Sequence, residues 1–124
     1  RTKKPASLRN IPFVASAMQV HKYNYAEAIS ISPFAKELAK LIPENMQSVN
    51  YKSIVKWLMQ EGFLVEGEID SNGRIPKVPT EKGREIGIYF EERERNGGSY
   101  LITLYNRDAQ KFLLEHMGEI ALMQ

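Results

Sequence analysis

Apolar side chains in the middle of the chain recur at the spacing of an α-helix. Between residues 51 and 60 they fall three, four and seven positions apart, which places them along one side of a helix. These apolar residues are Tyr51, Ile54, Val55, Leu58 and Met59. The residues expected on the outward side are Lys52, Ser53, Lys56 and Gln60. Because Gly62 tolerates the positive φ that closes many helices, we expect this helix to end at Glu61 or Gly62.

A β-hairpin is predicted directly after this helix. Phe63, Leu64 and Val65 are aromatic and aliphatic residues of the kind that favour a strand. Residues 70 to 73 read Asp-Ser-Asn-Gly, and an Asn-Gly pair is the strongest short-range hairpin signal. Residues 74 to 78 are therefore expected to return as the second strand.

An earlier helix is predicted over residues 33 to 42. Ser30 and Ser32 are good N-cap types, and Pro33 suits the first helical position. The apolar residues that share one face are Phe34, Leu38, Leu41 and Ile42. Pro43 ends the helix, because the residue before a proline is pushed out of the helical region. Residues 11 to 28 show no clean period, and both helix and strand remain open for residues 11 to 20.

The C-terminal third predicts a short helical turn, a second hairpin and a last helix. Thr80 can cap one or two turns within residues 79 to 88. Strands over residues 88 to 94 and 100 to 105 flank the Asn-Gly-Gly-Ser run at 96 to 99. Asn106 then caps a helix with one apolar face. That face carries Ala109, Phe112, Leu113, His116 and Ile120.

Length and composition indicate one domain. The chain has 124 residues, of which 43% are hydrophobic, enough for one substantial core. We assign residues 1 to 10 to a flexible basic arm or linker and residues 11 to 124 to the domain. The chain begins with Arg1, and we expect it to be a fragment of a longer polypeptide. It has no cysteine and no long apolar run, so we expect a cytoplasmic protein without disulfides or a membrane span.

The positive charge is concentrated at the N-terminus. The net charge is +2, but Arg1, Lys3, Lys4 and Arg9 lie in the first ten residues. The remaining 13 basic and 15 acidic residues give a net charge of −2. Affinity for a polyanion would therefore depend on local patches of lysine and arginine, which neutralise phosphates.

No group of residues predicts catalysis. Glu66, Glu68 and Asp70 alternate along one strand and its turn, which is more typical of a solvated strand edge than of a metal site. His116 is expected to pack on the last helix, and Trp57 is expected to pack in the core. We therefore predict that the chain is not an enzyme, with no catalytic residues, no metal and no cofactor.

Two motifs resemble winged helix-turn-helix DNA-binding domains. The run YKSIVKWLMQEGFLVEGE followed by a hairpin and VPTEKGREIGI is similar to modules near the ends of phage-type antirepressors and related bacterial DNA-transaction proteins. The resemblance covers roughly residues 30 to 88 and rests mainly on WLMQEGFL and PTEKG. It implies an α+β, winged helix-like fold with three or four helices and two β-hairpins. Either hairpin could be the wing.

The resemblance also implies a regulatory or DNA-processing protein that binds double-stranded DNA. The helix at residues 51 to 60 would enter the major groove, while basic residues on the hairpin and the following turn would hold the backbone. The DNA-binding residues implied are Lys52, Ser53, Lys56, Gln60, Arg74, Lys77, Lys82 and Arg84. An alternative is a module for protein-protein interaction or homodimerisation with the same fold, acting through Trp57, the strand at residues 100 to 105 or the last helix.

Overall fold

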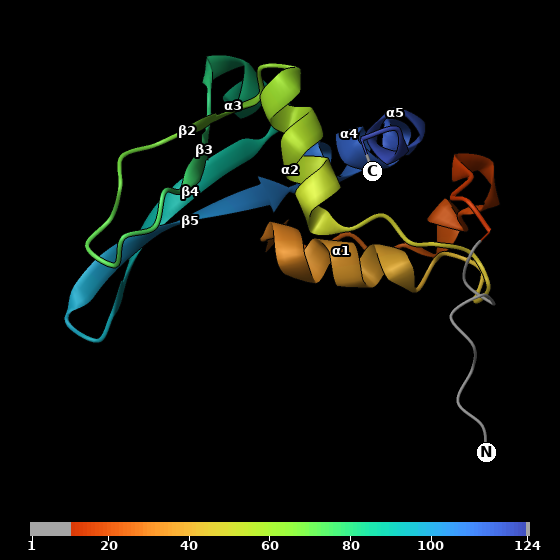
Figure 1. Cartoon of the computed structure of the whole chain (residues 1–124), viewed down its shortest axis with the longest axis horizontal. Coiled ribbons are helices and arrows are strands. Elements are labelled where there is room, and N and C mark those ends of the chain that lie inside the picture. Colours follow the sequence, from red (N-terminus) through yellow and green to blue (C-terminus); the bar gives the residue numbers. More distant parts are fainter. Residues whose placement is uncertain (1–10, 124) are drawn as a thin grey trace.

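The computed structural model describes residues 11–123, and the predicted arm at residues 1 to 10 lies outside them. The described chain is an α+β fold with two antiparallel sheets, which confirms the predicted class. Its three longer helices are α1 (Ile31–Ala39), α2 (Tyr51–Gln60) and α4 (Arg107–Glu115). In Figure 1 these helices gather in one body, and two β-hairpins extend from it.

Helix α2 ends at Gln60, one residue before the predicted end at Glu61 or Gly62, and Glu61 is its C-cap. The Asn50 side chain caps it by accepting a hydrogen bond from the Ser53 N–H at 3.0 Å. Gly62 follows the helix with a φ of +84°. The residues buried along the helix, however, are Ser53, Ile54, Trp57 and Leu58.

The predicted outward position of Ser53 is therefore wrong, as is the predicted packed position of Tyr51. Ser53 is only 5% exposed, whereas Tyr51 is 42% exposed. The helix is rotated because the Trp57 ring packs in an aromatic cluster, with centroids 6.0 Å from Phe63 and 5.4 Å from His116. The predicted core position of Trp57 is confirmed.

Helix α1 starts two residues earlier and ends three residues earlier than predicted. Ser30 is its N-cap, but the Ser30 side chain makes no capping hydrogen bond. Pro33 lies in the first turn, where a missing amide donor costs nothing. Residues 40 to 42 form turns ahead of Pro43 rather than a further helical turn.

The regular strand pairing of the first hairpin is confined to its base. Strands β2 (Leu64–Glu66) and β3 (Lys77–Pro79) are antiparallel, with Val65 opposite Val78. The predicted strand at residues 74 to 78 is thus shorter and begins later. The predicted turn is present, because the Asp70 carboxylate accepts hydrogen bonds from the N–H groups of Asn72 and Arg74 at 2.8 and 2.9 Å. Helix α3 (Glu81–Ile86) follows and is capped by Thr80 as predicted.

The second hairpin belongs to a three-stranded sheet with the order β1-β5-β4. Strands β4 (Ile88–Arg95) and β5 (Gly98–Asn106) pair along eight residues. Their turn is the predicted one, with φ of +52° at Asn96 and +80° at Gly97. The third strand, β1 (Ala28–Ile29), comes from the segment whose structure the sequence left open, and it pairs with the end of β5. The rest of that segment contains two 3₁₀ turns, η2 (Ala15–Ala17) and η3 (Val20–Lys22).

The predicted last helix is two helices, since α4 ends at Glu115 and α5 (Met117–Ala121) follows. The buried Gln110 side chain of α4 joins the distant segment at residues 23 to 26 to the end of β5. Its Oε1 accepts hydrogen bonds from the Tyr23 hydroxyl at 2.7 Å and the Ala26 N–H at 3.2 Å, and its Nε2 donates to the Tyr105 carbonyl at 3.0 Å. Burial, with Glu37 and Tyr25 nearby, raises the pKa of Tyr23 to about 12.

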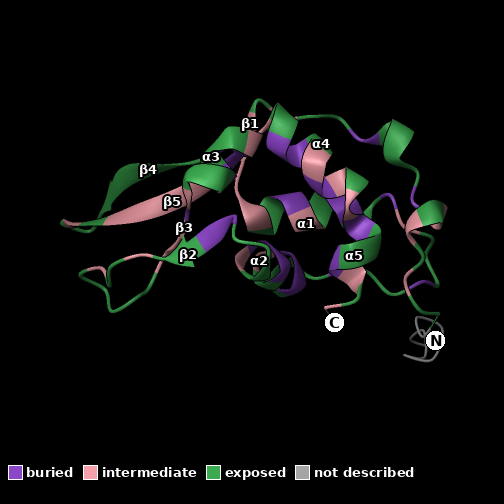
Figure 2. Ribbon diagram, turned by 90° about the horizontal axis from the view of Figure 1, so that it is seen from above, coloured by how far each residue is buried: buried purple, intermediate pink, exposed green. Residues whose placement is uncertain are grey.

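Burial is unevenly distributed between the helices and the hairpins. Figure 2 shows buried residues concentrated in α1, α2, α4 and α5, whereas β4 is exposed along nearly all its length. The predicted exposure of its charged run at residues 91 to 95 is confirmed. From here on, the arm means the two hairpins together, residues 64 to 79 and 88 to 106, and no longer residues 1 to 10. The body means the packed helices.

Candidate nucleic-acid interface

The exposed side of α2 carries positive charge and no acid. Lys52, Lys56 and Gln60 are exposed and lie four residues apart, so they follow one line along the helix. No aspartate or glutamate occurs between Tyr51 and Gln60. Within residues 11–123, neither lysine forms an ion pair. Their ammonium groups are therefore available to an anionic partner.

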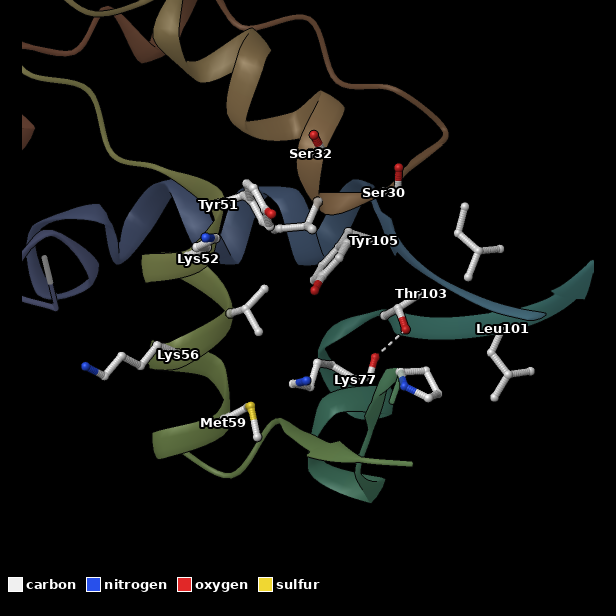
Figure 3. Close-up of a pocket in the computed structure, with 14 residues that line it drawn as sticks. Ser30, Ser32, Tyr51, Lys52, Lys56, Met59, Lys77, Leu101, Thr103 and Tyr105 are labelled. Carbon is white, nitrogen blue, oxygen red and sulfur yellow. Dashed lines mark hydrogen bonds between the residues drawn. The ribbon is translucent and has the colours of Figure 1, made fainter. Parts of the chain in front are cut away.

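Lys77 joins Lys52 and Lys56 around one groove. The groove lies between α2 and β5 and has a volume of about 570 Å³. Figure 3 shows Lys77 reaching from β3 toward α2, whereas Lys56 extends from α2 away from β5. The Lys77 Nζ lies 3.8 Å from a Glu66 carboxylate oxygen, and the Lys77 carbonyl accepts a hydrogen bond from the Thr103 hydroxyl. The hydrogen bond from Thr103 to the Lys77 carbonyl connects β5 to β3 beside the groove.

The groove is apolar between its charged edges. Its apolar lining comprises Ile31, Val55, Met59, Pro76, Leu101 and Ile102. Among the described residues that line it there is no aspartate or glutamate. The arrangement combines an apolar floor with lysine side chains along its edges, which suits a ligand that has both apolar and anionic parts.

Arg74 lies in a second cavity, of about 560 Å³, between the two hairpins. Arg95 lines the same cavity, with its guanidinium 5.2 Å from the centre of the Tyr100 ring. Pro76 and Leu101 line both cavities, so the second cavity adjoins the groove beside α2. We call the two adjoining cavities together the cleft.

Lys82 has a structural role in this fold. Its Nζ donates a hydrogen bond to the Glu61 carbonyl at 2.7 Å and lies 4.5 Å from the centre of the Phe63 ring. A cation at this point stabilises the C-terminus of α2, where carbonyl groups lack helical partners. Arg84 is exposed on α3 and lines neither part of the cleft.

The predicted site residues are therefore only partly brought together. Lys52, Lys56 and Lys77 meet at the groove, and Arg74 lies further along the cleft. Gln60 extends the line of exposed residues on α2, whereas Ser53 is buried and its backbone N–H is bonded to Asn50. The basic residues of β4 are offset by acids, since Arg93 pairs with Glu91 at 3.0 Å.

β5 was not among the predicted DNA-binding elements, although the alternative protein-interaction module included the strand at residues 100 to 105. Leu101 and Thr103 line the groove opposite α2, together with Ile31 at the start of α1. A signal was present in the sequence, because residues 100 to 105 are apolar on both sides of the strand while only one side can cover a core.

No family model, curated protein or solved structure matches this chain. Within residues 11–123, no helix is long and apolar enough to cross a membrane. The same residues contain no group of three or more histidine, aspartate or glutamate side chains placed to hold a metal ion.

Proposed function

We propose that this chain is a winged-helix domain that binds double-stranded DNA. The order of elements supports it: β1, α1 and α2 precede the β4–β5 hairpin, and β1 pairs with the second strand of that hairpin. A winged helix has this connectivity. In this assignment β4–β5 is the wing, and β2, β3 and α3 form an insertion between the reading helix and the wing.

The observation that carries the proposal is the exposed line of Lys52, Lys56 and Gln60 on α2. In the major groove, lysine can contact phosphates or guanine, and glutamine can form two hydrogen bonds with adenine. α1 packs beside α2 as the supporting helix of the pair. Arg74 and Arg95, near the turns of the hairpins, can reach the DNA backbone on the same side as the cleft.

The geometry narrows the set of predicted DNA contacts. The buried Ser53 and the engaged ammonium group of Lys82 are left out of the proposed interface. Arg84 is retained only as a surface cation that can add to the long-range attraction of phosphates. The proposed contacts are Lys52, Lys56, Gln60, Arg74 and Lys77 from the predicted set, with Arg95 added from the second hairpin.

A titration with a fluorescent DNA duplex at two salt concentrations tests the proposal. With about three phosphate contacts, affinity should fall roughly 40-fold between about 50 and 200 mM salt. The Lys52→Glu, Lys56→Glu double variant should lose binding at low salt, because it places two acids on the reading helix. The matched control is Lys22→Glu with Lys111→Glu, which makes the same charge change at exposed positions outside the cleft.

The outcomes separate the DNA proposal from general attraction to charge. Wild-type binding that is lost in the first variant and retained in the control supports the interface on α2. Absence of binding at low salt, or equal losses in the two double variants, contradicts it.

A further inference from the structure

Strand β5 has an open edge beside the cleft. β4 pairs with β5 from Gly98 to Tyr105, but on the other side β1 reaches only Tyr105 and Asn106. The Asn106 N–H donates to the Gly87 carbonyl on the β4 side at 3.1 Å. Since strand residues alternate in direction, the backbone groups of Leu101 and Thr103 point to the opposite side. Within the described residues, no strand pairs with them there.

The groove follows this open edge. Its lining includes the three consecutive residues Leu101, Ile102 and Thr103, as expected of a space along the side of a strand rather than over one face. It starts where the chain leaves β1 and enters α1, at Ser30 (Figure 3). A segment placed in the groove would extend the line of β1 along β5.

The basic residues that line the cleft favour an acidic occupant. Lys52, Lys56 and Lys77 line the groove, with Glu66 3.8 Å from the Lys77 ammonium group, and Arg74 and Arg95 line the adjoining cavity. The one acid lining that second cavity is Asp70, whose carboxylate already accepts two backbone hydrogen bonds. The N-terminal ten residues of this chain carry four cations and no acid, so charge disfavours them as occupants.

We propose that the cleft binds an extended acidic peptide of another protein, which adds as a strand to the open edge of β5. The peptide backbone pairs with Leu101 and Thr103, its apolar side chains pack on Val55 and Met59, and its carboxylates meet the lysines. An unpaired strand edge offers the hydrogen bonds, and the apolar floor disfavours a phosphate backbone at the same place. This inference goes beyond DNA binding and does not depend on it.

A short fluorescein-labelled peptide in which glutamate alternates with valine tests the proposal. It is compared with two N-methylated versions of the same peptide. One version is methylated on the odd-numbered backbone amides and the other on the even-numbered ones. Only one set of amides faces β5 in a strand pair, so one version should lose binding by about tenfold or more and the other should retain it. A peptide with lysine in place of glutamate should not bind. Equal affinities of the two methylated versions, or binding of the lysine peptide, would overturn the proposal.

Amide hydrogen exchange gives a second measurement that needs no protein variant. The N–H groups of Leu101 and Thr103 should exchange more slowly when the glutamate peptide is bound, because they become paired. The Ile102 N–H, which already faces β4, should change little. Protection of all three amides alike, or of none, contradicts strand addition.

A protein variant then separates the peptide proposal from the DNA proposal. Leu101→Gln places a neutral polar group on the groove floor. It should lower the affinity for the peptide roughly tenfold and change the affinity for the DNA duplex by no more than about twofold. The matched control is Ile69→Gln, at an exposed position outside the cleft. A parallel loss of peptide and duplex affinity in the folded Leu101→Gln variant would assign the groove to the nucleic-acid surface and overturn the peptide proposal.

Discussion

The body and the arm are ordered by different forces. In the body, fully buried side chains such as Phe34, Leu58 and Leu113 are removed from water by helix packing. In the arm, β4 and β5 are held by backbone pairing, and Asp70 closes the first hairpin through backbone hydrogen bonds. The body therefore sets global stability, while the arm keeps polar groups and strand edges available for a partner. Changes in the two regions should differ in size and in kind.

The largest expected effect contrasts a buried side chain of the body with an exposed one of the arm. Leu113→Ala leaves a cavity in the core and should lower the free energy of unfolding by about 2–5 kcal/mol. Val65→Ala, at an exposed position of β2, should change it by less than about 0.5 kcal/mol. Urea unfolding measures both. Similar losses for the two variants would contradict the difference between body and arm.

Alkaline pH should destabilise the fold through its two buried tyrosines, Tyr23 and Tyr105. Burial raises the pKa of Tyr23 to about 12 and raises that of Tyr105 further, so both stay neutral in the folded chain while the unfolded chain ionises above about pH 10. The contribution of the two tyrosines to the free energy of unfolding is complete below pH 10. Between pH 10 and about 12 the free energy of unfolding should fall by roughly 1.4 kcal/mol per pH unit for each tyrosine.

The Tyr23→Phe variant isolates one of these two contributions. It should flatten the alkaline loss, because phenylalanine does not ionise. Tyr51→Phe, which makes the same chemical change at an exposed tyrosine on α2, is the matched control. Thermal unfolding followed across this pH range measures the profiles, and identical slopes for Tyr23→Phe and wild type would argue against the assignment.

Gly83 tests the junction between the first hairpin and α3. A Cβ at this position would overlap the Phe63 carbonyl oxygen, so Gly83→Ala must displace α3 and should cost about 2 kcal/mol. Gly97→Ala, in the turn of the second hairpin, meets no atom within 4 Å and is strained only by its φ of +80°. It should cost about 1 kcal/mol. A larger loss for Gly97→Ala in urea unfolding would show that the junction is not tightly packed.

The smallest expected effect concerns the hydrogen bond between the two hairpins. Thr103→Val removes the hydroxyl that donates to the Lys77 carbonyl and should cost about 1 kcal/mol. Because the bond holds β3 beside β5, amide exchange in the first hairpin should become faster while exchange in α4 stays the same. Uniform acceleration across the chain would mean that the arm does not open separately from the body.

Local chemistry allowed much of the fold to be predicted. Caps and turns depend on neighbours within a few residues, so the end of α2, the start of α3 and both hairpin turns lie close to where Gly62, Thr80 and the Asn-Gly pairs indicate. The exposed positions of Lys52 and Lys56 on α2 were also predicted, whereas the exposed position predicted for Ser53 was wrong. Helix ends and strand lengths were less accurate, as α1 and β3 show, because they depend on packing as well as on local preference.

The sequence by itself determined which segments form helices and hairpins, because those choices are made within one turn of the chain. Only the tertiary structure decided which side of α2 is buried. Trp57 packs against Phe112 and His116, more than 50 residues away, and this contact rotates the helix so that Ser53 is covered. It also decided that β1 ends after two residues and leaves β5 open beside the lysines. Strand pairing and helix rotation are set by long-range burial, which no local pattern contains.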